Sequence, residues 1–372
     1  MKRFLPILLI VCVLLCACSQ NDPSQTTTVP TETTAATAAS DPQPEVTETT
    51  AVENTAATEA TEMTVDIIRY RNPLNGTPVD SVWTTRPFAV MINNIIYAQP
   101  MCSLSDADWL FEVLAEGGIT RCLAVYSDVS KVEHIGSIRS CRPYYADIAE
   151  SFNAIYAHHG GTDDGYSMIY SLDLDHIDSN HDAYYRDQAR LNEGYDLEHT
   201  SFTEGSSLVS TATDLGYATS YDSGVDFGYQ FDDQSSAAGG SSASQITVTF
   251  GGYGKTTTLN YNGETGTYSA YQYNGDVIDG NTGEVVDFRN ILVIRAETSS
   301  YAYGSKTVLD ITLTGEGEGH FACDGKMVPI TWSREDQHSP FVFTHEDGTP
   351  ITFGVGSSYI AVIPASSSVD AQ

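Results

Sequence analysis

The chain has 372 residues, and its 17 basic and 49 acidic side chains give a formal net charge of −32 at pH 7. This charge excludes nucleic acid as an expected partner, because the phosphates of DNA and RNA require a basic surface. Any site for an anion must therefore be built from a small number of cations.

Residues 1–17 have the organisation of a bacterial signal peptide. Lys2 and Arg3 form its charged end, and residues 4–15 form an apolar stretch. This stretch is shorter than the roughly 20 apolar residues that a membrane-spanning helix needs. The sequence Leu-Cys-Ala-Cys that ends at Cys18 resembles the lipobox of lipoprotein signal peptidase, so we expect cleavage before Cys18 and acylation of Cys18. The alternative is a plain secretory signal in which Cys18 has no role.

Residues 18–64 are expected to form a disordered stalk behind the acylated cysteine. The sequence from Ser19 to Met63 is rich in Thr, Ala, Glu, Pro and Ser, with eight acidic residues and no basic one. Such a segment cannot bury enough apolar area to offset the entropy that ordering would cost. A multiply acylated cysteine would anchor it durably, because each buried methylene contributes about 0.8 kcal/mol.

Residues 65–205 mix helix and strand signals, which predicts a layered α/β domain. Short apolar runs predict strands, and an apolar face behind a capping residue predicts a helix. We expect strands at residues 86–93, 119–126 and 154–158 and a helix at residues 142–152.

A further helix is expected between Ser105 and the glycine pair at residues 117–118. Ser105 is followed three residues later by an acid, which approximates a capping box, and paired glycines commonly end a helix. Such a helix would place Glu112 and Glu116 four residues apart on one face.

The composition changes after residue 205. Residues 206–240 are rich in Ser, Gly and Asp and are expected to be a flexible connector, and residues 241–372 show short alternating runs with Asn-Gly and Asp-Gly pairs between them. Such pairs favour tight hairpin turns, so we expect a smaller antiparallel β-domain. Strands are expected at residues 245–250, 291–296, 308–313 and 359–363. The whole folded part is therefore predicted to be α+β.

Four cysteines lie beyond the anchor, at Cys102, Cys122, Cys141 and Cys323. Their spacing matches no metal-ligand pattern, and they are too few for a disulfide scaffold. We expect them to be mostly buried thiols, with a single disulfide as the alternative.

Several segments together resemble the YerB-like family of bacterial lipoproteins, a pair of domains of unknown function. They are Asn72 to Gly76, Arg86 to Asn94, Ala107 to Glu112, Glu116 to Arg121, Ile135 to Ser140, Arg142 to Tyr145, Tyr184 to Asp187, Tyr261 to Tyr268, Asn290 to Val293, Gly325 to Trp332 and Gly354 to Pro364. The resemblance covers essentially everything after the stalk. It implies an extracytoplasmic lipoprotein with an α/β domain and a β-domain, and it implies no established reaction. Where the family commonly has a Pro-His-Asn-type run, this chain has Gly194 to His199.

Arginine is the most informative residue type in this acidic chain. Nine of the 15 basic residues left after the signal peptide lie between residues 65 and 200. Four of them, Arg121, Arg139, Arg142 and Arg186, stand in the family-like segments. Guanidinium groups bind phosphate and carboxylate bidentately, so converging arginines would form an anion pocket. The alternative is that they pair with Glu112, Glu116 and Asp187 in structural salt bridges.

Two further segments could hold a ligand. His158 and His159 end a predicted strand, and neighbouring strand residues point to opposite faces, so one of them is expected to be buried while the other lines a cleft. A metal bound by this pair is the alternative. The acidic run Asp173 to Asp182 lacks the spacing of an EF-hand loop, so we expect an ordinary loop there, with an adventitious calcium site as the alternative.

We expect a binding protein on the outer face of the cell membrane rather than an enzyme. Its partners would be the bilayer, through acylated Cys18, and an anionic cell-wall polymer or an envelope protein, and no cofactor is expected. The alternative is a cell-wall polymer transferase or hydrolase acting on a phosphate-linked substrate. Replacing Arg142 by alanine is predicted to abolish binding with little loss of stability. The expected site residues are Arg121, Arg139, Arg142, Arg186, Asn93, Glu112, His158 and Asp187.

Overall fold

Mostly apolar strands form the centre of a large sheet. The computed structural model describes residues 70–251, 254–303 and 306–372, so the predicted signal peptide, Cys18 and the stalk lie outside the described residues. β3 (Phe88–Ile92), β4 (Trp109–Leu114) and β5 (Thr120–Tyr126) consist entirely of buried residues. Strands covered on both faces have this continuous apolar pattern. The strands predicted at 86–93 and 119–126 are therefore confirmed.

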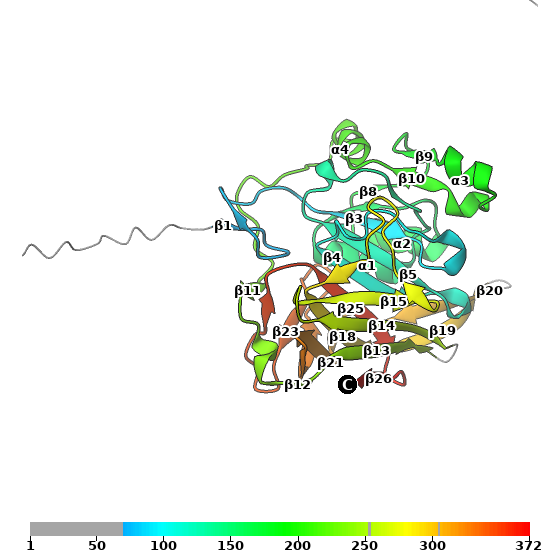
Figure 1. Ribbon diagram of the computed structural model, residues 1–372. Coiled ribbons are helices and arrows are strands. Elements are labelled where there is room, and N and C mark those ends of the chain that lie inside the picture. Colours follow the sequence, from blue (N-terminus) through cyan, green and yellow to red (C-terminus); the bar gives the residue numbers. More distant parts are fainter. Residues whose placement is uncertain (1–69, 252–253, 304–305) are drawn as a thin grey trace, which may run out of the picture. The chain divides into compact units, whose positions relative to one another are not determined.

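The central sheet takes strands from both halves of the chain (Figure 1). Its order is β12, β22, β21, β18, β25, β4, β5, β3, β7 and β8, with β23 paired to β22. The bounds not yet given are β7 (Ile155–Ala157), β8 (His176–Ile177), β12 (Ser241–Ser242), β18 (Asn290–Ala296), β21 (Gly315–Cys323), β22 (Lys326–Arg334), β23 (Val342–Thr344) and β25 (Ser358–Pro364). β25 runs parallel to both β18 and β4.

A six-stranded antiparallel sheet lies in the C-terminal half. Its order is β16, β15, β14, β13 and β26, and β17 pairs with β15. The bounds are β13 (Gln245–Phe250), β14 (Lys255–Asn262), β15 (Thr267–Gln272), β16 (Gly275–Asp276), β17 (Asp287–Phe288) and β26 (Val369–Ala371). The predicted hairpins are present, and so are the predicted strands, but the one at residues 359–363 is part of β25 and pairs in parallel with both neighbours. One tight turn joins β21 to β22 through Asp324 and Gly325, whose φ angles are 55° and 70°, as a type I′ turn requires.

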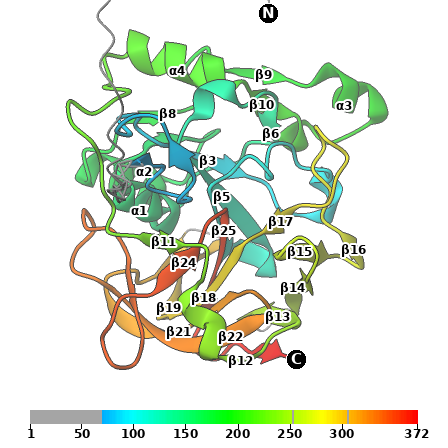
Figure 2. The same cartoon turned by 60° about the vertical axis from the view of Figure 1, so that its left-hand side comes forward.

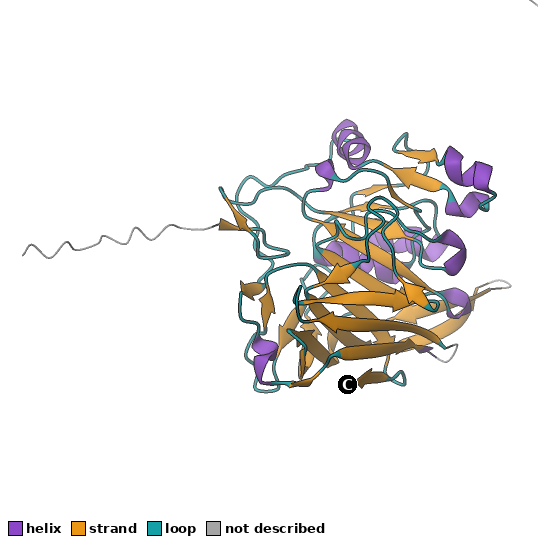
Figure 3. Cartoon of the chain, in the orientation of Figure 1, coloured by secondary structure: helices purple, strands orange, loops and turns teal. Residues whose placement is uncertain are grey.

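Both faces of the central sheet are covered by separate hydrophobic clusters. Alternate residues of β3 point to opposite sides, so Val90 packs in one cluster and Met91 in the other. Helices α1 (Pro143–Ser151) and α2 (Asp163–Ser171) cover the Met91 side. The six-stranded sheet and helix α4 (Gly205–Asp214) contribute to the Val90 side. Figure 3 shows few helices among many strands, and the predicted α+β class and the helix at 142–152 are confirmed.

Smaller elements surround this framework. A three-stranded sheet of β6 (Ile135–Gly136), β10 (Ser201–Thr203) and β9 (Tyr184–Arg186) lies near helix α3 (Gln188–Glu193), as Figure 2 shows. The remaining strands are β1 (Tyr70–Arg71), β2 (Pro78–Val79), β11 (Gln230–Asp232), β19 (Thr298–Tyr303), β20 (Lys306–Ile311) and β24 (Thr352–Gly354). Short 3-10 turns are η1 (Ile96–Ala98), η2 (Glu116–Gly118), η3 (Val129–Lys131), η4 (Leu197–His199) and η5 (Ser236–Gly239).

The helix predicted from Ser105 is wrong. Residues 109–114 instead form β4, which is buried along its whole length between β25 and β5. Apart from Glu112, its sequence Trp-Leu-Phe-Glu-Val-Leu is apolar on both faces, which suits a doubly covered strand better than an amphipathic helix. Glu112 therefore points into the core from a strand, and Glu116 lies in η2, so the two carboxylates do not share a helix face.

Two further expectations differ from the structure. The segment expected to be a flexible connector contains α4, β11 and η5. The second half is not a simple antiparallel meander, because the parallel strand β25 joins the sheet of the first half. Hairpin turns in a sequence report pairing between neighbouring strands, and they carry no signal for pairing between strands that are far apart in the chain.

The four cysteines of the folded part are free thiols. Cys102, Cys122, Cys141 and Cys323 are all buried, as expected for small apolar side chains. None of the helices in the described part of the chain has the length and apolar character needed to cross a membrane.

Candidate functional site

The four predicted arginines line one cavity of about 450 Å³. We call it the arginine pocket, and it is lined by Arg121, Ile138, Arg139, Ser140, Arg142, His159, Arg186, Leu197, Glu198 and Ser201. Residues that are more than 60 positions apart in the sequence meet here. Positive charge that is scarce in the chain as a whole is therefore gathered at one place.

The backbone around the arginine pocket brings these side chains together. The segment with Arg139 lies between two strand ends, because the Arg139 amide donates to Met91 O and the His159 amide donates to Arg139 O, both at 3.0 Å. Arg121 belongs to β5, and Arg142 is the N-cap residue of α1. Arg186 lies directly opposite Ser201 in the pairing of β9 with β10.

Arg121 is a buried cation with an incomplete set of partners. Its residue is 5 % exposed, and Nη1 donates to Ser140 O at 2.7 Å. Its buried Nε has no hydrogen-bond partner. Burial, together with repulsion from Arg142 and Arg139, lowers the pKa of Arg121. Among the described residues, no carboxylate forms an ion pair with Arg121, and an unpaired buried charge is costly.

Arg142 has the structural role that was the alternative expectation. Its Nε donates to Glu116 Oε1 at 2.6 Å and its Nη2 donates to Glu116 Oε2 at 2.9 Å. Burial opposes the charged form of Glu116, but the hydrogen bonds and charge of Arg142 outweigh it and lower the pKa of Glu116. Arg142 therefore contributes to the wall of the pocket and to its positive potential. Its guanidinium group is already bound to a carboxylate.

Arg139 and Arg186 are more available to a ligand. Arg139 Nη1 lies 3.1 Å from Glu198 Oε2, but the Glu198 side chain is 58 % exposed, and Arg139 Nε is buried without a partner. The charge of Arg139 lowers the pKa of Glu198. Arg186 is exposed, and it donates to Leu197 O at 2.7 Å and to His159 Nε2 at 3.2 Å.

The contacts of His159 fix its hydrogen-bonding roles. Arg186 can only donate, so His159 Nε2 accepts and Nδ1 carries the proton that it donates to Ser201 Oγ at 2.7 Å. Burial and the charges of Arg186 and Arg139 lower the pKa of His159, which keeps the ring neutral near pH 7. Because Ser201 is the acceptor in this bond, its own hydroxyl proton is free to point into the pocket.

The structure does not place Asn93 and His158 in the arginine pocket. Asn93 is buried, and its Nδ2 lies 3.0 Å from His199 Nδ1. His158 is also buried, with Nδ1 at 2.8 Å from Gly160 O and Nε2 at 3.1 Å from His176 Nδ1. The structure therefore puts His159, the other member of the pair, at the pocket, because the chain turns out of β7 after residue 157.

Glu112 and Asp187 also lie outside the arginine pocket. Glu112 is fully buried on the other side of the sheet, where its carboxylate accepts hydrogen bonds from side chains of both halves of the chain. Asp187 is the N-cap of α3, and its Oδ1 accepts from the amides of Ala189 and Arg190 at 2.8 and 3.2 Å. Both carboxylates therefore have structural partners.

Sequence reasoning missed Ile138, Leu197, Glu198 and Ser201 as pocket residues. Leu197 and Glu198 belong to the run in which this chain departs from the family-like pattern, and such a departure next to an otherwise family-like segment was the available signal. Ser201 gave none, because its role comes from the pairing of β10 with β9.

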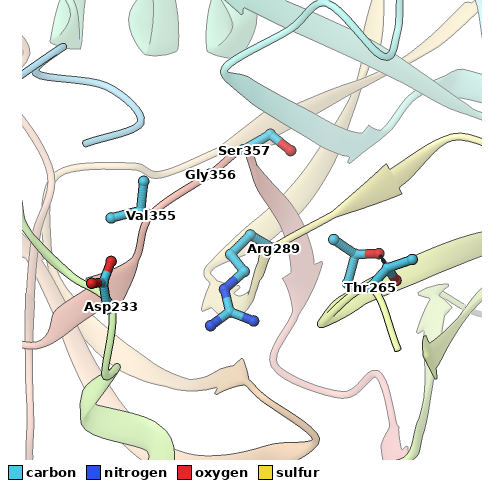
Figure 4. Close-up of a pocket in the computed structure, with 7 residues that line it drawn as sticks. Asp233, Thr265, Arg289, Val355, Gly356 and Ser357 are labelled. Carbon is cyan, nitrogen blue, oxygen red and sulfur yellow. Dashed lines mark hydrogen bonds between the residues drawn. The ribbon is translucent and has the colours of Figure 1, made fainter. Parts of the chain in front are cut away.

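A second pocket of about 440 Å³ lies in the C-terminal half, around Arg289 (Figure 4). The Arg289 side chain extends between Asp233 and Thr265. Its Nη1 is already held by Asp324 Oδ1 and by Gly266 O, both at 2.6 Å. This arginine already has a carboxylate partner, so the pocket around Arg289 is less suited to binding an anion than the arginine pocket is. Within the described residues, no group of three or more His, Cys, Asp and Glu side chains is arranged to hold a metal ion.

The fold and the arginine pocket define an acidic α+β protein whose two halves share one sheet and in which four arginines line one cavity. The chain belongs to the family described as "Protein of unknown function (DUF3048)", whose N-terminal domain matches residues 74–218 and whose C-terminal domain matches residues 246–360. The expected YerB-like family is therefore confirmed.

Two comparisons with individual proteins agree with this assignment. The chain is 26 % identical over 302 residues to "Putative lipoprotein YerB" of Bacillus subtilis (strain 168), which covers 80 % of this chain and 87 % of that protein. The crystal structure of the YerB protein from Bacillus subtilis superposes with a TM-score of 0.69 at 24 % identity, over 81 % of this chain and 99 % of that one. This structural likeness shows the fold.

Proposed function

We propose that the chain is an extracytoplasmic lipoprotein, anchored through acylated Cys18, whose arginine pocket binds the anionic group of a cell-envelope ligand. The lipobox-like sequence before Cys18 supports the anchor, and so does the likeness to a relative whose name includes "lipoprotein". The stalk would then give the folded part reach away from the membrane.

The single observation that carries the binding proposal is the incomplete pairing of Arg121. This buried guanidinium lines the arginine pocket and has an unpartnered Nε, and Arg139, which also lines the pocket, has a second unpartnered Nε. Both cations lie in a molecule that is otherwise strongly acidic. An anion in the pocket would supply the missing negative charge, and charge-assisted hydrogen bonds to guanidinium groups are about twice as strong as neutral ones.

The size and lining of the pocket favour an oxyanion that is attached to a larger molecule. A cavity of about 450 Å³ is much larger than one phosphate or carboxylate group needs. Ile138 and Leu197 add apolar surface beside the arginines. Phosphate and carboxylate both fit the guanidinium forks, so the shared chemistry is an oxyanion with an uncharged remainder.

The same geometry favours binding over nucleophilic catalysis. A serine nucleophile needs a neighbouring base that accepts its proton. His159 Nδ1 donates to Ser201 because Arg186 occupies the acceptor nitrogen of the ring. The hydrogen bond therefore runs from His159 to Ser201, whereas an activated serine would donate its proton to the histidine.

Calorimetric titration of the full chain with inorganic phosphate tests the pocket. We expect saturable binding that is weakened roughly tenfold or more in Arg121→Gln and Arg186→Gln, because each removes a charge-assisted hydrogen bond worth about 1.5–3 kcal/mol. Lys131→Gln removes the same charge from an exposed side chain that pairs with Asp128, and it should bind as the parent does. Equal weakening in all three variants would mean general electrostatics, and equal binding by all would assign the arginines to the structure.

The anchor has an independent test. In cells given a labelled fatty acid, the parent should carry label and sediment with membranes, and Cys18→Ala should lose both. Unlabelled parent protein would overturn the anchor without bearing on the arginine pocket.

A further inference from the structure

A second group of reactive side chains lies on the opposite side of the central sheet from the arginine pocket, in the core between β4, β14 and β15. Lys255 Nζ donates to Gln272 Oε1 at 2.7 Å, and Gln272 Nε2 donates to Glu112 Oε2 at 3.0 Å. Lys255 Nζ also lies 3.5 Å from Glu112 Oε1. One carboxylate thus contacts both an amine and a carboxamide that contact each other.

Strand register fixes this contact. β14 and β15 are antiparallel with Thr258 opposite Tyr271, so Lys255 and Gln272 are diagonal neighbours on one face of the sheet. Because Nζ is 2.7 Å from Oε1 and a carbonyl bond measures about 1.23 Å, the carbon Cδ of Gln272 is at most about 3.9 Å from Nζ. A small shift therefore brings the amine to attacking distance from this carbon, which is about 3–3.5 Å.

The surroundings hold Glu112 in place. Its Oε1 accepts from Asn94 Nδ2 at 3.0 Å and Thr120 Oγ1 at 2.6 Å, and its Oε2 accepts from Thr257 Oγ1 at 2.8 Å and Tyr359 OH at 2.6 Å. Glu112 is fully buried.

The two reacting groups are almost as enclosed as the carboxylate. Lys255 and Gln272 are 8 % and 6 % exposed, and the ring of Tyr273 lies 4.3 Å from Nζ. A preorganised carboxylate in a buried site can move protons between an amine and a leaving group.

We propose that Lys255 and Gln272 form an intramolecular amide bond, with Glu112 as the proton carrier. Lys255 Nζ gives a proton to Glu112 and attacks Gln272 Cδ, and the new C–N bond forms as the bond from Cδ to Nε2 breaks. Glu112 passes one proton from Nζ to Nε2, which leaves as ammonia, and a second proton from Nζ, also passed on by Glu112, converts the ammonia to ammonium. The ammonium cation carries away the charge of the lysine, so atoms and charge balance and no oxidant is required.

The ammonia that is released can reach solvent, and the amide bond would stabilise the fold. A cavity of about 250 Å³ lined by Lys255, Gln272 and Tyr273 lies beside the cluster and gives ammonia a path to solvent. Exported proteins are often stabilised by disulfides, but the four cysteines of the described part are free thiols. An amide bond between β14 and β15 would supply a covalent link by a route that is independent of thiols.

Tryptic digestion of the full chain, followed by mass spectrometry, tests the proposal directly. The sequence from Leu191 to Arg289 contains one internal tryptic site, after Lys255. With the amide bond present, trypsin leaves residues 191–289 as one fragment, lighter than its sequence mass by one molecule of ammonia. Chymotrypsin, which cuts after tyrosines such as Tyr261 and Tyr268 inside the linked loop, should then give two pieces that stay joined.

Two variants provide the controls. Lys255→Arg keeps the positive charge but cannot form the amide, and it should give separate fragments that end at position 255 and begin at position 256. Glu112→Gln keeps the shape of the side chain but cannot carry protons, and it should also leave Gln272 intact. Separate fragments of unmodified mass from the parent chain would overturn the proposal, whether or not either variant folds. A linked fragment in Glu112→Gln would overturn the role of Glu112.

Discussion

Arg142 holds Glu116 in a two-pronged contact, with Nε at 2.6 Å from Oε1 and Nη2 at 2.9 Å from Oε2. The side chains are 12 % and 22 % exposed, so the pair is shielded from most of the solvent. This contact joins the N-cap of α1 to the turn that precedes β5. The contact gives Arg142 a structural role in the arginine pocket. Replacing Arg142 should therefore change the stability of the protein.

Arg142→Ala should lower the free energy of unfolding by about 2 kcal/mol, because it leaves the half-buried carboxylate of Glu116 without its partner. Urea denaturation measures this loss. The double variant Arg142→Ala with Glu116→Gln should recover part of the loss, because no unpaired charge remains. Unchanged stability in Arg142→Ala would contradict this role and restore the expectation drawn from the sequence.

The elements of the fold that sequence reasoning found are those whose signals are local. The strands with Phe88 and with Leu123 are short apolar runs, and the turn at Asp324 has the residue pair that positive φ requires. β4 was missed because Ser105, followed three residues later by an acid, resembles the capping box of a helix. Its two partners, β5 and β25, decide its conformation, and β25 is more than 200 residues away.

The arginine pocket was predicted by composition, and its details come from tertiary packing. Scarce arginines in an acidic chain indicated a gathering of cations, and the four side chains do line one cavity. Which arginine is already paired depends on where η2 puts Glu116. Which histidine faces the cavity depends on where the chain leaves β7. The local sequence predicts neither the placement of Glu116 nor the residue at which the chain leaves β7.

Arg186→Gln should raise the pKa of His159. Burial, repulsion from Arg186 and repulsion from Arg139 all lower this pKa in the parent, and the replacement removes one of the two repelling charges. It also removes the donor at 3.2 Å that competes with protonation of Nε2. Titration of the histidine ring signals by NMR would measure the change, with Lys131→Gln as the charge-matched control. An unchanged or lower pKa of His159 in Arg186→Gln would show that Arg186 does not act on the ring.

The buried His158 should make the protein sensitive to mild acid. Burial lowers the pKa of His158 to about 4, against an ordinary value near 6.5. Between these values the unfolded chain takes up a proton that the folded chain refuses, so stability is complete above pH 6.5 and is lost as the pH falls towards 4. The loss from this group is up to about 3 kcal/mol.

The variant His158→Asn isolates that contribution. Asparagine cannot take up the proton, and its amide can still donate to Gly160 O, which His158 Nδ1 contacts at 2.8 Å. Free energies of unfolding measured at several pH values should therefore fall less steeply between pH 6.5 and 4 in the variant. Parallel curves for parent and variant would mean that His158 is not held neutral.

The two family domains should unfold together. β25 lies between β4 and β18, and the buried pair of Arg334 and Asp147 joins β22 to α1 at 2.8 Å. Removing either half would expose the paired edge of β4 and leave a buried charge alone, which costs several kcal/mol. We expect circular dichroism and tryptophan fluorescence to give the same urea midpoint, since Trp109 and Trp332 report on opposite halves. A fragment that ends at residue 240 should lack a cooperative transition, and two separate midpoints in the full chain would show that the shared sheet does not couple its halves.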